Sequence, residues 1–318
     1  MKTYLLATLV ALAVSVVFCR VLIPVLRRWK AGQNILVYVK EHKGKSGTPT
    51  MGGIAFIAAA VLSAVLFIGK TDRTTVLCLV IGLAYMTVGV LDDLLKRKHK
   101  ENLGLKAWQK LVLQISVAVF CGLYCLRAGL TELHIPFWNK SLQIGGWMFP
   151  LAVFTFIATV NAVNLTDGLD GLASGASAPF FAVIGILIAL QDGSESIALL
   201  SFCLTGALLG YLPFNVSPAS VFMGDTGSLA LGGFAAAIAT FTGNALYLLV
   251  IGACFVFSVI SVLLQVIYYK ATGGKRIFLM APAHHHFQEK GYSESQISYA
   301  YFLITLALGA LCLVTALS

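Results

Sequence analysis

The feature that most constrains this chain of 318 residues is a series of long apolar runs. A helix needs about 20 apolar residues to cross a bilayer core roughly 30 Å thick, and about ten runs approach that length. They cover residues 3–24, 51–69, 74–91, 108–127, 147–163, 173–190, 196–212, 227–242, 245–269 and 296–317. Only 11% of the residues are charged, against about a quarter in soluble domains. The sequence therefore predicts an all-α polytopic membrane protein with about ten transmembrane helices.

The first apolar run is expected to remain in the protein as a transmembrane helix. Lys2 is the only charge that precedes it, and residues 17–20 lack the small side chains of a signal-peptide cleavage site. We therefore expect residues 1–318 to form a single integral membrane domain.

The lysines and arginines indicate the orientation of the spans, because basic residues are enriched in cytoplasmic loops. If the N-terminus lies outside, sixteen of the 22 basic residues fall on the cytoplasmic side: Arg27, Arg28, Lys30, Lys40, Lys43, Lys45, Lys96, Arg97, Lys98, Lys100, Lys106, Lys110, Lys270, Lys275, Arg276 and Lys290. This asymmetry predicts that both termini are periplasmic or extracellular. It also accounts for the net charge of +9 through topology and anionic lipid or substrate, without a nucleic-acid partner.

One external loop has a pattern of its own. Residues 128–147 alternate polar and apolar side chains between turn residues, which is typical of a short β-hairpin, and we expect the hairpin near residues 132–146. Trp138 and Trp147 are suited to the membrane interface.

Two adjacent carboxylates, Asp92 and Asp93, follow the third apolar run and precede a basic cluster that includes Lys96. At a low-dielectric boundary the two acids resist joint ionisation unless a cation or several hydrogen-bond donors hold them. Alternatively, the pair marks the solvated end of a helix, and this stretch taken alone favours that interpretation.

Two further cytoplasmic loops carry acids and no basic residue. One contains Asn164, Asp167 and Asp170, and the other contains Phe222 and Asp225 among glycines. Uncompensated acids between two spans are candidates for function, and their oxygens suit a hard cation or sugar hydroxyls. Phe222 offers a stacking surface for a flat ring. The alternative is that these acids cap the helices that follow.

Two other cytoplasmic segments are suited to anions. Residues 45–53 combine Lys45 and Thr50 with glycines and a proline just before a helix N-terminus, where amide groups and the helix dipole favour negative charge. His284, His285 and His286 are adjacent, so they do not all point to one metal. They fit phosphate contacts or one proton transfer better than zinc. A simple turn and a solvated loop are the respective alternatives.

Under the predicted topology all of these motifs fall on one side, in loops 25–50, 92–110, 164–172, 213–226 and 270–295. Carboxylates among lysines and histidines, with no cysteine pair, describe a Mg²⁺ site for phosphate chemistry. A transporter, the competing class, would bury ionisable groups near the bilayer midplane. Here the span centres are almost free of charge, so an enzyme that joins a soluble reactant to a lipid is favoured.

The same motifs carry a resemblance that runs essentially end to end. The sequence closely resembles the phospho-N-acetylmuramoyl-pentapeptide transferase (MraY-type) family, within the polyprenyl-phosphate N-acetylhexosamine-1-phosphate transferase superfamily. The adjacent aspartates are common to the superfamily, whereas the histidine run resembles the muramyl-pentapeptide branch. The matching segments are Gly47–Gly53, Asp92–Lys96, Asn161–Gly171, Phe222–Ser228 and Pro282–Phe287.

The resemblance implies transfer of phospho-MurNAc-pentapeptide from UDP-MurNAc-pentapeptide to undecaprenyl phosphate, giving lipid I and UMP with Mg²⁺ as cofactor. This is the first membrane step of peptidoglycan synthesis, and it places the protein in the bacterial inner (plasma) membrane among membrane lipids, with its active site on the cytoplasmic face. Families of this kind are typically homodimers and are targets of nucleoside antibiotics. A sister enzyme that uses UDP-GlcNAc is the nearest alternative.

Residue roles follow from the same matching motifs. Asp225 is expected to be the principal Mg²⁺ ligand, with Asp93 supporting the metal or Asp92. Asp92 is expected to deprotonate the lipid phosphate, while a phospho-enzyme formed on the adjacent pair stays an open alternative. His284 completes the catalytic set. The expected substrate-binding residues are Lys45, Thr50, Lys96, Asn164, Asp167, Asp170, Asn215, Phe222, His285 and His286, with Phe222 stacking on uracil.

One departure from the family pattern concerns the start of the fourth apolar run. Family members often carry a lysine where this chain has Trp108, two residues before Lys110. A role for Lys110 is therefore left open.

Overall fold

A computed structural model describes residues 2–29, 47–69, 72–99, 104–138 and 140–317 of the chain. Its elements are α1 (Lys2–Arg28), α2 (Gly53–Phe67), α3 (Arg73–His99), α4 (Ala107–Ala128), β1 (Glu132–His134), β2 (Ser141–Gln143), η2 (Gly145–Trp147), α5 (Met148–Thr166), α6 (Leu172–Leu190), α7 (Glu195–Asn215), α8 (Gly224–Phe241), α9 (Tyr247–Val250), α10 (Ala253–Ala271), α11 (Ala283–Glu289) and α12 (Glu294–Leu317).

The expectation of an all-α polytopic membrane protein is confirmed. The described residues contain eight helices that are long and apolar enough to cross a membrane, namely α1, α3, α4, α5, α6, α7, α10 and α12. Two further helices account for the other expected runs: α2 has only 15 residues, and α8 has 18 and is buried along almost its whole length. The run at 245–269 is not one helix, because the chain turns at residues 251–252 between α9 and α10.

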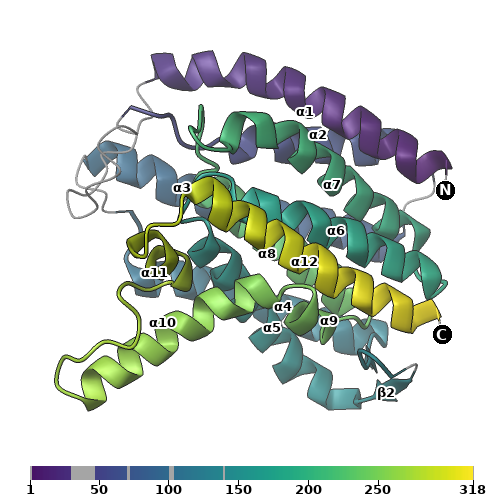
Figure 1. Cartoon of the computed structure of the whole chain (residues 1–318). Coiled ribbons are helices and arrows are strands. Elements are labelled where there is room, and N and C mark those ends of the chain that lie inside the picture. The colour runs from purple at the N-terminus through teal and green to yellow at the C-terminus, as the bar shows by residue number, and fades with distance from the viewer. Residues whose placement is uncertain (1, 30–46, 70–71, 100–103, 139, 318) are drawn as a thin grey trace.

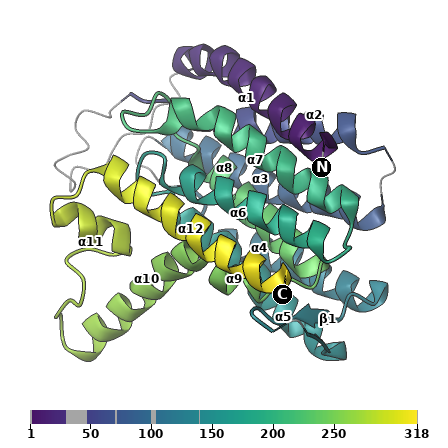
Figure 2. The same cartoon turned by 45° about the vertical axis from the view of Figure 1, so that its right-hand side comes forward.

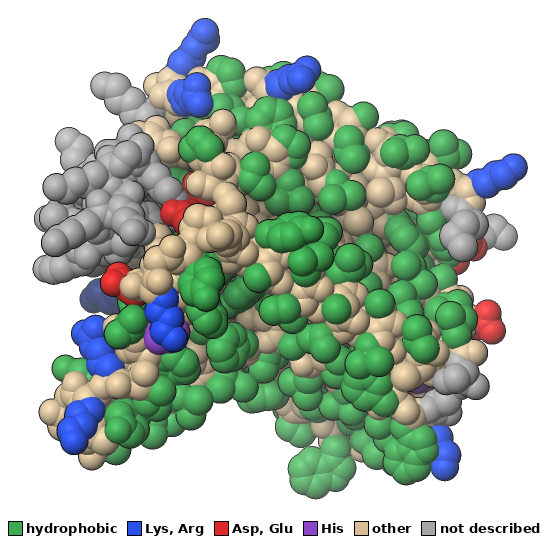
Figure 3. Space-filling model, viewed as in Figure 1, with side chains coloured by type: hydrophobic (Ala, Val, Ile, Leu, Met, Phe, Trp, Pro, Cys, Tyr) green, Lys and Arg blue, Asp and Glu red, His purple; other side chains and the backbone are tan. Residues whose placement is uncertain are grey.

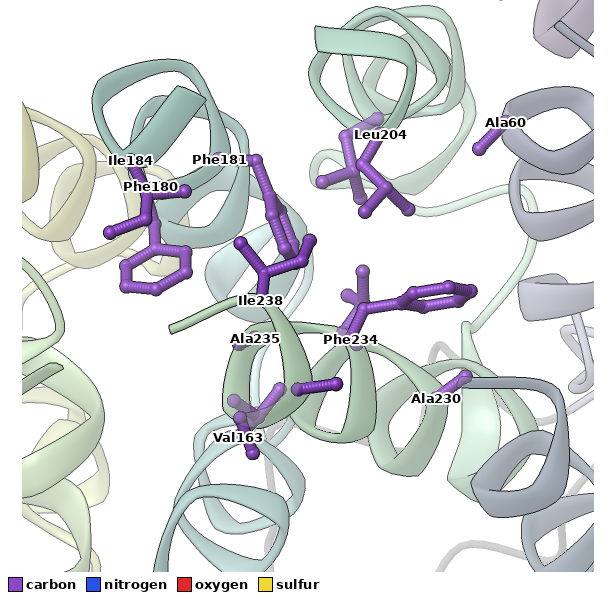
Figure 4. Close-up of a cluster of buried hydrophobic side chains, with 14 of the residues drawn as sticks. Ala60, Val163, Phe180, Phe181, Ile184, Leu204, Ala230, Phe234, Ala235 and Ile238 are labelled. Atoms are coloured by element: carbon purple, nitrogen blue, oxygen red, sulfur yellow. The ribbon is translucent and has the colours of Figure 1, made fainter. Parts of the chain in front are cut away.

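Helix α8 lies at the centre of the bundle and packs against α3 and α5. Small residues make this close packing possible, as is usual between membrane helices. A side chain at Gly82 of α3 would collide with the ring of Phe234 on α8, and one at Gly89 would collide with the backbone of Asp225. Figure 4 shows Phe234 and Ile238 of α8 facing Phe181 of α6 and Leu204 of α7 in this core. The first turn of α8 is thereby held against α3.

The bundle has two distinct ends. Both termini and the β-hairpin lie at one end, while α11 and the C-terminal end of α3 lie at the other (Figures 1 and 2). Helix α10 projects away from the remaining helices toward the second end. Hydrophobic side chains cover most of the face seen in Figure 3, as expected for a surface in contact with lipid.

The expected hairpin is present. Strands β1 and β2 pair antiparallel, with Leu133 opposite Leu142. A hydrogen bond from the backbone N–H of His134 to the carbonyl of Gly243 joins the hairpin to the chain that follows α8.

Candidate active site

Asp225 occupies the first turn of α8 and is contacted by side chains from three other helices. Lys110 of α4 and Lys96 of α3 place their Nζ atoms 2.7 Å and 3.1 Å from Oδ2 of Asp225. Asn164 of α5 donates to Oδ1 from Nδ2 at 3.0 Å. Four helices therefore meet at one carboxylate.

The charge of Asp225 is set by these neighbours. Burial alone would raise the pKa of this carboxyl group, since the charged form loses hydration. Lys110 and Lys96 offset that cost and hold the pKa of Asp225 below its usual range. Asp225 is therefore ionised at neutral pH and available as a hard oxygen ligand.

Asp93 holds the N-terminus of α8. Its Oδ2 accepts hydrogen bonds from the backbone N–H of Thr226 at 3.0 Å and from the Thr226 hydroxyl at 2.7 Å, and its Oδ1 lies 3.3 Å from the backbone N of Asp225. These amides have no partner within the helix, and a carboxylate beside them also complements the helix dipole. Asp93, only 1% exposed, thus fixes the turn that carries Asp225.

Asp92 lies one residue earlier on α3 and faces a different set of donors. Its Oδ1 accepts from the backbone N–H of Leu105 at 2.7 Å, and Nζ of Lys96 lies 2.6 Å from its Oδ2. The spacing of Asp92 and Lys96 puts them on the same helix face. A Cβ at Gly104 would lie 2.5 Å from Oδ1 of Asp92, so only glycine lets the loop approach this carboxylate.

The three carboxylates form a cluster that suits a metal ion. Ligand atoms of Asp92, Asp93 and Asp225 all lie within 4.8 Å of one another. Next to them, a Cβ added to Gly224 would lie 2.5 Å from Oδ2 of Asp93 and 2.6 Å from Oγ1 of Thr50. That hydroxyl is buried and has no hydrogen-bond partner among the described residues. An unsatisfied oxygen beside three acids, which carry more negative charge than two lysines balance, fits a divalent cation.

Asn164 forms hydrogen bonds with residues in and around this cluster. Its amide nitrogen donates to Asp225 and to Oγ of Ser228, and its Oδ1 accepts from Lys110 at 3.2 Å. Asn164 therefore orients the Asp225 carboxylate and the Lys110 ammonium group, rather than leaving its whole amide free for a nucleoside.

Asp167 lies near the cluster, and His284 lies against the neighbouring Gly168. Asp167 follows α5, and its pKa is raised well above the ordinary value by burial and by the negative charges of Asp225 and Asp93. His284, fully buried at the start of α11, has its pKa lowered to about 3 by burial and by His285. Its Nε2 lies so close to Gly168 that a side chain there would clash. Neither ring nitrogen has a hydrogen-bond partner among the described residues, so His284 is a neutral imidazole.

Asp170 and Asn215 shape the segment before α8. Asp170 accepts from the backbone N–H of Ala219 at 3.0 Å, and Asn215 donates to the carbonyl of Val221 at 3.0 Å. Backbone hydrogen bonds from Phe222 to Pro49 and from Gly52 to Phe222 join this segment to the start of α2. The two side chains thus hold a loop on which the partly exposed Phe222 sits.

His285 and His286 are engaged within α11 and its preceding loop. His286 accepts at Nδ1 from the backbone N–H of Leu279 at 3.1 Å, and His285 shares a 3.1 Å hydrogen bond with Gln288. No described contact brings either ring to the acidic cluster. Lys45, the other expected substrate contact, lies outside the described residues.

Comparisons with known proteins show which family this chain is similar to. The profile of glycosyl transferase family 4 matches residues 75–243, and signature 1 of the phospho-N-acetylmuramoyl-pentapeptide-transferases matches residues 45–57. Proteins named phospho-N-acetylmuramoyl-pentapeptide-transferase are 43% identical in Bacillus subtilis (strain 168), over 98% of this chain and 97% of the relative, and 42% identical in Clostridium novyi (strain NT), over 100% and 97%. The relative in Clostridium botulinum (strain Eklund 17B / Type B) is 42% identical over 96% and 94%.

The chain belongs to the phospho-N-acetylmuramoyl-pentapeptide-transferase family. It is accordingly an enzyme. The family signature contains Thr50, whose hydroxyl faces the cluster, and the matched family 4 region contains Asp92, Asp93 and Asp225.

Several residues of the candidate site had no role predicted from the sequence. Lys110 is hydrogen-bonded to Asp225, and its position at the end of the basic stretch 92–110 was the available signal. Thr226 and Ser228 belong to the quoted Phe222–Ser228 motif but received no role. Glu294, which accepts from the backbone N–H of Asp170 at 2.9 Å, gave no signal, because an acid in the first turn of a helix is common.

Proposed function

We propose that this enzyme transfers phospho-N-acetylmuramoyl-pentapeptide from its UDP ester to undecaprenyl phosphate, releasing UMP and forming lipid I. The single observation that supports this reaction most strongly is the cluster of Asp92, Asp93 and Asp225 flanked by Lys96 and Lys110. Phosphoryl transfer between two anionic reactants depends above all on positioning and charge neutralisation, and this cluster supplies hard oxygen ligands and two cations.

In the proposed reaction, an oxygen of the lipid phosphate attacks the phosphorus that bears the sugar. A new P–O bond forms, and the bond from that phosphorus to the bridging oxygen of UMP breaks, so that UMP leaves with the electron pair. Asp92 accepts the proton of a monoprotonated lipid phosphate. Its link to the amide of Leu105 and to Lys96 keeps the carboxylate in place.

Mg²⁺ is the proposed cofactor, held by Asp225 with support from Asp93. When bound, it would polarise the diphosphate and stabilise the charge on departing UMP. Lys96 and Lys110 neutralise further phosphate charge beside the same carboxylate. The uridine is proposed to bind near Phe222 and Asp167, with the phenyl ring stacking on uracil.

The experiment is a transferase assay with purified protein, Mg²⁺, undecaprenyl phosphate and either UDP-MurNAc-pentapeptide or UDP-GlcNAc. We expect UMP and a lipid-linked product from the muramyl donor only. Product from UDP-GlcNAc alone would replace the proposal with the sister activity. Uptake into proteoliposomes without UMP release would point to a transporter.

Two features of the assembly are part of the same proposal. The protein is proposed to lie in the bacterial inner membrane with its acidic cluster on the cytoplasmic face, where UDP-linked substrates are found. It is also proposed to form a homodimer, as oligomeric membrane enzymes commonly do through closed symmetry. Chemical crosslinking in the membrane, read as the mass of the product, tests the dimer.

A further inference from the structure

The first two turns of α12 hold the backbone of Asp170. Oε2 of Glu294 accepts from the backbone N–H of Asp170 at 2.9 Å, and Oγ of Ser298 donates to the backbone carbonyl of Asp170 at 2.8 Å. Glu294 and Ser298 are four residues apart, so they project from the same face of the helix. Both backbone polar groups of one buried loop residue are therefore satisfied by a helix that lies more than 120 residues later in the sequence.

The side chain of Asp170 carries the connection onward. Its Oδ2 accepts from the backbone N–H of Ala219 at 3.0 Å, within the loop that leads to Phe222. Asn215 supports the same loop by donating to the carbonyl of Val221, and its own Oδ1 accepts from Ser174 at 2.6 Å. Asp170 is only 3% exposed, so its side chain has little room to adopt another conformation. A shift of its backbone would therefore move its carboxylate away from the backbone N–H of Ala219.

We infer that Glu294 and Ser298 are positioning residues for the uridine pocket. They fix the backbone of Asp170 so that its carboxylate holds the loop that displays Phe222. This inference rests on the proposed function, which assigns Phe222 to the nucleoside. The acidic cluster is held by other contacts from α3, α4, α5 and α8. Loosening the α12 contacts should therefore weaken binding of the nucleotide more than it slows the transfer step.

The test compares Glu294→Ala with Glu294→Gln in the full-length enzyme. Glutamine keeps an oxygen that can accept from the Asp170 N–H, whereas alanine removes this acceptor. We expect Glu294→Ala to raise KM for the UDP-linked donor, and the Kd for UMP, by about tenfold with little change in kcat, and Glu294→Gln to restore both. Glu289→Ala, which removes an exposed acid from the end of α11, is the matched control and should leave both constants unchanged.

Ser298 provides a second variant. Ser298→Ala should weaken UMP binding in the same direction, and the double variant with Glu294→Ala should be less than additive, because both side chains hold one residue. Thermal unfolding of each variant checks that the protein is folded.

Three results would overturn the inference: unchanged KM and Kd in Glu294→Ala, a fall in kcat alone, or equal defects in the alanine and glutamine variants. Phe222→Ala is measured alongside to separate the two proposals. If Phe222→Ala leaves UMP binding intact, the assignment of the pocket is wrong. If it weakens binding while Glu294→Ala does not, only the positioning role fails.

Discussion

Asp92 and Asp225 belong to one cluster, but we expect their substitution to affect turnover and Mg²⁺ dependence differently. Asp92→Asn removes the proton acceptor while keeping an oxygen that can accept from Leu105. We expect turnover to fall by about 100-fold or more, with UMP binding nearly unchanged.

Asp225→Asn removes the charge that Lys110 and Lys96 neutralise, and should abolish turnover and weaken its dependence on Mg²⁺. Activity titrations with Mg²⁺ and equilibrium binding of UMP distinguish the two. A phospho-aspartate trapped in a single turnover would contradict direct attack.

His284 should make the fold sensitive to acid. Its pKa is about 3 in the folded protein and about 6.5 when unfolded, so between these values the unfolded chain binds a proton that the folded chain does not. Stability is therefore lost as the pH falls below about 6.5. We expect His284→Gln to lose less of its melting temperature than the unmodified protein when the pH is lowered from 7 to 5. An equal loss in both proteins would show that His284 is not the group responsible.

The N-terminus of α8 is the element on which the site depends most. Thr226→Val removes the 2.7 Å hydrogen bond to Asp93 without changing side-chain volume, and should lower the free energy of unfolding by about 1–3 kcal/mol and reduce turnover by displacing Asp225. Thr205→Val is the control, because that buried hydroxyl donates to the carbonyl of Ser201 within its own helix, α7, and not to the acidic cluster. Thermal unfolding and the transferase assay are the measurements. Equal effects of the two variants would contradict this role of Asp93.

The apolar runs predicted the helices well because their length is a local property of the sequence. The break between α9 and α10 was missed, since residues 245–269 are apolar on both sides of the turn. The course of α3 was also underestimated. Its helix continues past the apolar run to His99, which is why Asp92 and Lys96 become neighbours on one helix face.

The sequence predicted which motifs form the site, but not which side chains pair within it. The distribution of basic residues predicted that all the motifs lie on the same side of the membrane. The structure brings Asp92, Asp93 and Asp225 together from helices far apart in the sequence. What the sequence could not reveal was the pairing within the cluster. Asp93 bonds to Thr226 across 133 positions, and no local pattern distinguishes an acid that caps a distant helix from one that is free to bind a metal.

The predicted orientation in the membrane can be tested with single cysteines. All seven native cysteines are buried, so they should react slowly with a membrane-impermeant maleimide. Lys140→Cys lies beside the hairpin, at the end of the bundle with both termini, and Lys275→Cys lies in the loop between α10 and α11 at the other end. Because basic residues concentrate at the second end, we expect label to reach Lys140→Cys in intact spheroplasts and Lys275→Cys only after the membrane is permeabilised. The unmodified protein is the control for background. The opposite labelling pattern would place the acidic cluster on the outer face, where UDP-linked donors are absent, and would contradict the proposed reaction together with the topology.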